Sequence, residues 1–187
     1  HHSVALRAEL ERTQWLPPES IRELQLARVR RFLAEAGRQV PYYERLFAQC
    51  AHMMLTIQRL PVPVVARVHG IATAAGCQLV AMCDLAVAAS DAQFAVSGVN
   101  LGLFCSTPSV ALSRNLGRKQ AFEMLVTGEF ISAEQAREKG LVNRVAAPDE
   151  LDAEVEHLVA SIVAKPAVAL AVGKALFYRQ LEKTIVE

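Results

Sequence analysis

An α/β fold is predicted by three features of the sequence. A β-branched run at residues 63–68 leads through very small residues into the apolar pattern of a helix, and a short apolar strand follows at residues 85–89. Apolar residues make up 52% of the 187 positions and charged residues 21%, which is enough to bury a core. The strand–helix–strand order implies a right-handed crossover between parallel strands.

The segments before the first strand are predicted to be helical. Pro17 and Pro18 precede a run, residues 21–33, in which apolar residues recur at helical spacing. Pro41 is expected to interrupt this helix, because proline lacks the backbone N–H and clashes with the preceding turn. A second helix is expected over residues 46–60, with its methionines on one face.

The central segment is expected to alternate strands with a helix. Strands are predicted at Val64–Val68 and Leu85–Ala89, and residues 91–95 are expected to begin a third. A helix from about Ala75 to Cys83 connects the first two strands.

The last third of the chain is expected to be mainly helical. Helices are predicted at residues 119–126, 133–139, 149–163 and 167–181, with an extended segment at 141–145. Gly128 should end the first of these helices. Ser132 and Gln135 form a capping box that should open the second, and Gly140 is placed to end it.

Composition excludes several classes of partner. A net charge of +1 gives no electrostatic case for nucleic acid, and no apolar run reaches the roughly 20 residues that span a bilayer. The four cysteines lack metal-ligand spacing, so we expect free thiols and no metal site. The first residues read as neither a signal nor a transit peptide, so we predict a cytoplasmic location.

The stretch Val68–Leu79 is the clearest candidate for chemistry. Its small side chains let a ligand approach the backbone closely. The first N–H groups of the helix that follows have no internal partner and sit at the positive end of its dipole. This arrangement suits a developing negative oxygen. Where a carboxylate would be useful, however, the sequence has Gln78.

From about residue 47 to 181 the chain resembles the crotonase (enoyl-CoA hydratase/isomerase) family. The matching segments, in order, are residues 63–70, 74–79, 83–88, 92–94, 101–102, 127–129, 131–136 and 140–145. Their order and spacing carry the resemblance. Within the family, residues 100–108 (Asn-Leu-Gly-Leu-Phe-Cys-Ser-Thr-Pro) resemble one particular branch.

The resemblance implies a partial crotonase-type ββα spiral that binds acyl-CoA thioesters, with no cofactor beyond the coenzyme A of that ligand. In this family two backbone N–H groups hold the thioester oxygen, and Ala75 is expected to supply one of them. Ala74, Gly76, Phe104 and Thr107 are expected to contact the substrate.

The residues that matter most for hydration depart from the family pattern. Two glutamates normally act on one water as base and acid, and their positions fall here at Gln78 and Gly98. An amide does not shuttle a proton at neutral pH, and glycine has no side chain. We therefore expect weak hydratase activity or none by the standard mechanism.

Three other residues have a simpler interpretation than a catalytic one. Asp84 is expected to end a helix and bond local N–H groups. His69 is expected to stabilise a turn. Cys105 would need an adjacent base to act as a nucleophile, and the sequence indicates none.

Both ends of the family pattern are missing. The upstream Ala/Ser-Gly-x-Asp-Leu motif, which supplies the second N–H, is not found, and the C-terminal helices that close the acyl pocket are absent. The family assembles as trimers or hexamers, and we expect that assembly to be weakened here.

Residues 1–47 form a separate, helical N-terminal arm in this interpretation, followed by a crotonase-like domain at 48–187. The arm resembles the N-terminal segment of phenylacetate-CoA ligase-like adenylate-forming enzymes, through residues 15–19, 24–25, 28, 33 and 40–43. No adenylation motif follows. The alternatives to an enzyme are therefore a non-catalytic acyl-CoA-binding or interaction paralogue, or a fusion product without activity.

Overall fold

The computed structural model describes residues 11–13, 15–39, 41–181 and 183–184, and divides into two compact units, residues 1–52 and 53–187. The described part of the first unit is helical. Helix α2 spans Pro18–Gln39 and helix α3 spans Pro41–Arg59, so that α3 begins in the first unit and ends in the second. Pro41 separates the two helices, as predicted, because proline is tolerated only in the first turn. Whether residues 1–47 are foreign to the family stays a prediction.

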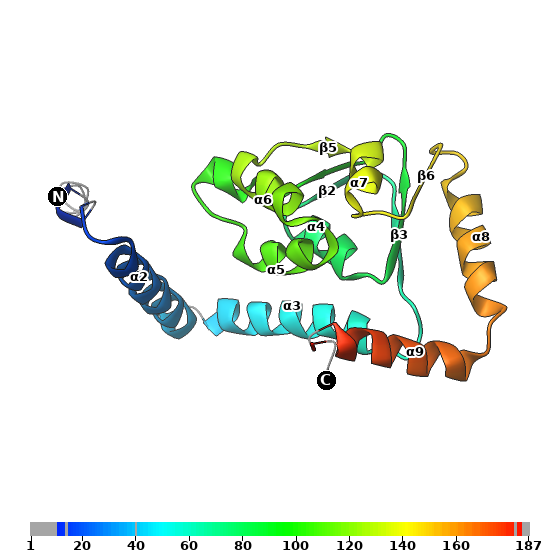
Figure 1. The fold of residues 1–187 in the computed structure, drawn as a ribbon, viewed down its shortest axis with the longest axis horizontal. Coiled ribbons are helices and arrows are strands. Elements are labelled where there is room, and N and C mark those ends of the chain that lie inside the picture. The colour runs from blue at the N-terminus through cyan, green and yellow to red at the C-terminus, as the bar shows by residue number, and fades with distance from the viewer. Residues whose placement is uncertain (1–10, 14, 40, 182, 185–187) are drawn as a thin grey trace. The chain divides into compact units, whose positions relative to one another are not determined.

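The described part of the second unit contains six short strands and, apart from them, mainly helices (Figure 1). The strands are β1 Val65–Val68, β2 Ile71–Thr73, β3 Leu85–Ala89, β4 Gln93–Ala95, β5 Ile131–Ser132 and β6 Arg144–Ala146. The helices are α4 Ala75–Met82, the 3₁₀ helix η1 Ser97–Leu101, α5 Ser106–Asn115, α6 Arg118–Thr127, α7 Ala133–Lys139, α8 Leu151–Val163 and α9 Ala167–Gln180.

The strands form two three-stranded sheets. In the first, β1 pairs with β3 and β3 with β6, all parallel. In the second, β2 pairs in parallel with β4, and β4 pairs antiparallel with β5. The predicted strand–helix–strand unit is therefore confirmed, with β1 and β3 as its parallel strands. Strand β2 was not predicted, because its three residues lie inside what the sequence presents as a small-residue turn.

Strand β3 separates two apolar cores. Ala86 and Ala88 point into the larger core, which also receives residues of α4, α5, α6 and α7. Val87 and Ala89 point the other way, against Leu151 and other residues of α8. Because alternate residues of a strand face opposite sides, a strand buried on both faces carries a continuous apolar run.

The helix ends follow their sequence signals. Ser132 accepts a hydrogen bond from the Gln135 N–H, and the Gln135 side chain accepts one from the Ser132 N–H, which completes the predicted capping box. Gly128 and Gly140 end α6 and α7 in the left-handed conformation (φ 65° and 88°), which favours glycine.

The described helices are also short or polar by the standard of a membrane span. No single helix among the described residues has both the length and the apolar character to cross a membrane. Helices α8 and α9 taken together are long and apolar enough for a span by length and composition only, and they are bent by 99° at their junction.

Candidate functional site

Two of the residues that the sequence singles out, Ala75 and Gly98, follow strands that end at the same edge of the second sheet. Strands β2 and β4 are parallel, with Thr73 opposite Ala95, so the chain leaves both strands on the same side. Just beyond that edge the hydroxyl oxygens of Thr73 and Ser97 lie 3.3 Å apart, within hydrogen-bond distance. The carboxyl ends of parallel strands are where ligands bind in open α/β sheets. Ala75 and Gly98 follow these two strand ends closely and flank this edge.

Ala74 joins β2 to α4 in a conformation that alanine rarely adopts. Its φ is 49° and its ψ is −115°, and it is the one residue other than glycine with positive φ in the described ranges. These angles match the first central residue of a type II′ turn, which is normally glycine. The Ala74 N–H donates to Ala95 O at 3.0 Å and its carbonyl accepts from Gln78 N–H at 3.0 Å. Strain held in place in this way is typical of functional sites.

Helix α4 begins directly after this turn, at Ala75. Ala74 is its N-cap and makes no side-chain capping bond, and the first turn contains no acidic residue. The first N–H groups of α4 therefore have no partner in the helix and lie at its positive end. Ala75 and Gly76 are exposed, and apart from its chain neighbours and the backbone of its own helix, nothing lies within 4 Å of where a Cβ on Gly76 would be. A carbonyl oxygen can thus approach this backbone.

Gln78 lies one turn further along α4. Its side chain is half-buried and makes no hydrogen bond to any described residue. A neutral amide can donate to or accept from a ligand, but it does not exchange a proton at neutral pH.

Gly98 lies in η1 and is packed so closely that it has no room for a side chain. A Cβ built there would lie 2.7 Å from Cys105 Sγ and 2.7 Å from the backbone oxygen of Leu103. The Gly98 N–H donates to that sulfur at 3.3 Å, and its carbonyl accepts from Leu103 N–H at 2.9 Å. A carboxylate at position 98 would therefore require the 98–105 segment to move.

The predicted acyl-pocket residues Phe104 and Thr107 lie in different surroundings. Phe104 lines a cavity of about 420 Å³ beside α5 and α6. Thr107 is exposed in the first turn of α5. Helix α5 was not predicted, because the sequence there has Pro108 and several hydroxyl residues, and no strong apolar period. A larger cavity of about 480 Å³ lies along β1 and includes His69.

Asp84 does more than the local role predicted for it. Its carboxylate accepts from Val64 N–H at 2.6 Å, from Lys174 Nζ at 2.6 Å and from the Tyr178 hydroxyl at 2.7 Å. Lys174 also donates to the backbone oxygens of Ile57 and Val62. Burial, and then the hydrogen bond to Asp84, raise the pKa of Tyr178. The group ties α9 to the strands and is structural.

The four cysteines are all free. Cys77 is fully buried in the larger core, and this burial raises the pKa of its thiol to about 12. Burial also raises the pKa of Cys83. Cys50 is exposed and Cys105 is half-buried against Gly98. A thiolate at Cys77 is therefore unavailable at neutral pH.

Comparison with known proteins shows which family the chain is similar to. A family model described as enoyl-CoA hydratase/isomerase matches residues 34–187. It begins thirteen residues before residue 47, the approximate start of the resemblance, and so includes the end of the predicted arm. It does not address the likeness of residues 1–47 to ligase-like enzymes.

Individual relatives agree with the family model. The chain is 49% identical to the mitochondrial enoyl-CoA hydratase domain-containing protein 3 of Xenopus laevis, over 82% of this chain and 52% of the relative. It is 48% identical to the human protein of the same name, over 81% of this chain and 49% of the relative. This is the branch that residues 100–108 resemble, so that prediction is confirmed. The chain spans about half the length of these relatives.

Solved structures share the fold. A crystal structure of an enoyl-CoA hydratase of Mycobacterium smegmatis is 72% identical, with a TM-score of 0.76, over 79% of this chain and 57% of that chain. The human protein's crystal structure is 48% identical with a TM-score of 0.76, over 81% and 59% of the two chains. The predicted partial crotonase-type α/β fold is confirmed.

The predicted cytoplasmic location is contradicted. The relatives from Xenopus laevis, rat, mouse and human are all named as mitochondrial. The prediction rested on the composition of the first residues, which does not report on targeting in a sequence that spans about half the length of these relatives.

Proposed function

Because the chain belongs to the enoyl-CoA hydratase/isomerase family, we propose that residues 53–187 bind an acyl-CoA thioester with its carbonyl oxygen at the Ala75 N–H. The free N–H groups at the start of α4 and the fixed turn at Ala74 support this role. Such donors stabilise the negative charge that develops on a thioester oxygen when an enolate forms.

The proposed site does not hydrate enoyl thioesters by the two-carboxylate mechanism. The absence of standard hydration is supported by the packing of Gly98 against Cys105 Sγ and Leu103 O, which leaves no space for a carboxylate at position 98. At the other glutamate position, Gln78 offers a side-chain amide that can form a hydrogen bond with a water or a carbonyl. Neither residue can take a proton from water at neutral pH, so binding is expected without standard hydration.

Removing a single backbone donor tests the carbonyl contact. Ala75 is the first residue of α4, where proline is tolerated. The residue before a proline is restricted, so the proline variant should carry Ala74→Gly as well. Ala74→Gly alone is then the matched control, and it differs from Ala74→Gly/Ala75→Pro only at position 75, where proline removes the N–H and adds its ring.

Titration calorimetry measures the affinity of both proteins for butyryl-CoA and for its thioether analogue, S-butyl-CoA. Loss of one hydrogen bond should weaken butyryl-CoA about tenfold in the double variant. S-butyl-CoA, which has no carbonyl, should bind both proteins equally. Equal affinity of butyryl-CoA for both proteins, or no binding to either, would overturn the proposal.

A further inference from the structure

A cavity of about 420 Å³ lies beside α5 and α6. Its volume falls within the range of about 300–1,000 Å³ that small-molecule pockets occupy. Its principal lining residues are Phe104, Ser109, Ser113, Arg118, Lys119 and Phe122.

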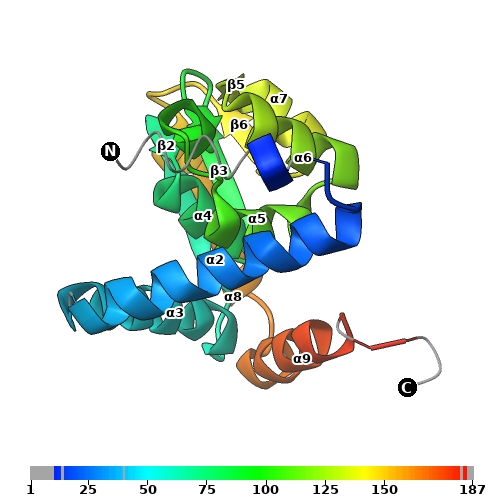
Figure 2. The same cartoon turned by 90° about the vertical axis from the view of Figure 1, so that its left-hand side faces the viewer.

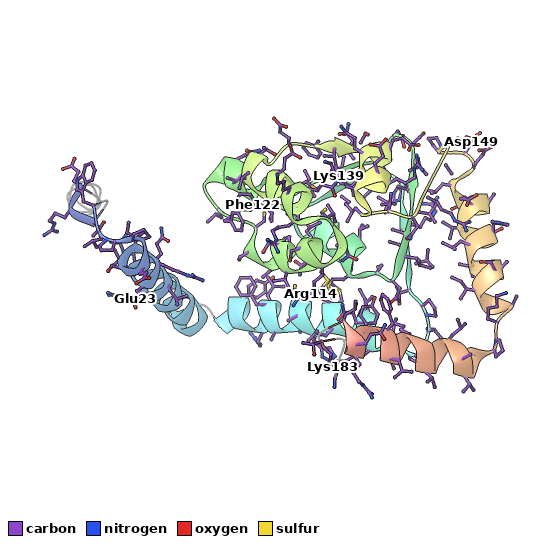
Figure 3. All side chains as sticks on the ribbon, viewed as in Figure 1. Glu23, Arg114, Phe122, Lys139, Asp149 and Lys183 are labelled. Atoms are coloured by element: carbon purple, nitrogen blue, oxygen red, sulfur yellow. The ribbon has the colours of Figure 1, made fainter. Side chains whose placement is uncertain are left out.

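The walls of this cavity are largely apolar and aromatic. Phe104 and Phe122 both line the cavity and are 51% and 59% exposed. Phe122 is labelled on α6 in Figure 3. Ala121 and Leu125, which are buried, complete the α6 side. An alkyl chain in the cavity would remove this aromatic surface from water, which is favourable.

Two cations stand at the same cavity. Arg118 and Lys119 form the first turn of α6, are exposed, and make no ion pair with any described carboxylate. No acidic residue lies in that turn, and the N-cap, Gly117, makes no side-chain bond. Positive side chains at the positive end of a helix dipole are unfavourable, so an anion placed there would offset both charges.

The cavity has no lining residue from β2 or α4, the elements that hold the Ala75 site. Helix α5 packs on α4 through Ala111 and Leu112, and the Asn115 side chain donates to Ala81 O on α4 at 2.9 Å. Figure 2 shows α4 and α5 side by side. Ser109 and Ser113 lie on a different side of α5, because they are one turn apart and offset from the buried positions. A ligand in the cavity would therefore not occupy the start of α4.

We propose that this cavity binds a medium- or long-chain fatty acid. The alkyl chain lies against Phe104 and Phe122, and the carboxylate meets Arg118, whose guanidinium can hold it in a bidentate pair, with Lys119 beside it. This binding does not depend on thioester binding at Ala75.

Titration calorimetry with dodecanoate tests the site. Dodecanoate should bind, while butyrate, which lacks the chain, and dodecyltrimethylammonium, which reverses the charge, should bind at least tenfold more weakly. Absence of dodecanoate binding at millimolar concentration would overturn the proposal. Dodecanoate should also leave the affinity for butyryl-CoA unchanged, since the two sites are separate.

Matched variants locate the binding. Phe122→Ala and Arg118→Glu should each weaken dodecanoate about tenfold. Phe130→Ala, which removes another half-exposed ring outside the cavity, and Arg179→Glu on α9 should not. Equal effects in all four would show that the cavity is not the site. If lauroyl-CoA binds more tightly than dodecanoate and is weakened by Phe122→Ala, the cavity holds the tail of the thioester and the separate site is wrong.

Discussion

The backbone N–H of Gly98 donates a hydrogen bond to the sulfur of Cys105 at 3.3 Å, and the same sulfur would lie 2.7 Å from a Cβ at position 98. The contact between Gly98 and Cys105 therefore holds the 98–105 segment together and occupies the space that a side chain at position 98 would need. The resemblance places a catalytic glutamate at this position. The structure thus gives a steric reason, beyond residue identity, for the absence of a carboxylate.

Adding a side chain at position 98 should destabilise the protein. Gly98→Ala is expected to lower the free energy of unfolding by about 1–3 kcal/mol, as overpacking in a filled site does. Urea unfolding followed by circular dichroism measures the change. Gly76→Ala is the control, because nothing lies within 4 Å of its Cβ, and it should be neutral or stabilising. A stable Gly98→Ala protein would contradict the packing argument.

Restoring both glutamates should fail to restore hydration. Gln78→Glu/Gly98→Glu places a carboxylate at each family position, but the second can enter only if Leu103 O and Cys105 Sγ move. The rate of crotonyl-CoA hydration by the double variant should therefore stay at that of the parent chain. Hydration at ordinary enzyme rates would show that the 98–105 segment adapts readily.

Relaxing the turn before α4 should stabilise the fold. At φ 49°, alanine carries a steric penalty that glycine avoids, offset partly by the greater entropy of glycine in the unfolded chain. The net gain for Ala74→Gly should be about 0.5–1 kcal/mol. Ala74→Val should lose stability, since a β-branched residue fits positive φ poorly. Thermal or urea unfolding of the parent chain, Ala74→Gly and Ala74→Val measures these changes in stability. A loss of stability in Ala74→Gly would contradict the strain assigned to Ala74.

The sequence predicts a structural element well when the residues that determine it lie close together along the chain. Strands β1 and β3, helix α4, and the capping box at Ser132 were foreseen, because apolar runs and capping residues act over a few positions. Strand β2 was missed, because its three residues are held by pairing with β4, 22 residues further along the chain. No short-range signal indicates such a partner.

The site was predicted in the same uneven way. Ala75, Gln78 and Gly98 were proposed as site residues from their order in motifs, and this assignment stays a prediction. The strain at Ala74 and the contact between Gly98 and Cys105 were not foreseen, because each is created by packing between separate elements. Asp84 was assigned a local role, yet its lysine and tyrosine partners come from α9, 90 and 94 residues further along the chain.

Breaking the buried pair that anchors α9 should be costly. Lys174 and Asp84 have side chains only 7% and 12% exposed, so removing one leaves the other unpaired in the interior. Lys174→Met should lower the free energy of unfolding by about 3–5 kcal/mol. Tyr178→Phe should cost about 1.5–3 kcal/mol, since it deletes one hydrogen bond to a charged group. Lys165→Met, at an exposed lysine, is the control, and an equal loss there would contradict the assignment.

Alkaline pH should weaken the fold through Cys77. Its pKa is about 12 in the folded chain against 9.0 ordinarily, so the unfolded state loses this proton first. The stability contribution is full below pH 9 and is lost as pH rises toward 12, at about 1.4 kcal/mol per pH unit. Cys83 and Tyr178, whose pKa values are also raised, act in the same direction.

The slope of stability against pH isolates the Cys77 contribution. Cys77→Ala should flatten the alkaline fall, whatever its effect on stability at pH 7. Urea unfolding at intervals from pH 8 to pH 11 measures both slopes. Parallel slopes in the two proteins would show that Cys77 ionises as readily in the folded chain as in the unfolded one.

The ultraviolet difference spectrum of crotonyl-CoA mixed with the purified chain, followed over time, tests the central claim most directly. A hydrogen bond from Ala75 to the thioester oxygen polarises the conjugated enoyl group and shifts its absorbance to longer wavelength, while hydration abolishes that absorbance. We predict a shifted band that persists. A band that disappears at ordinary enzyme rates, or one that never shifts, would contradict the account.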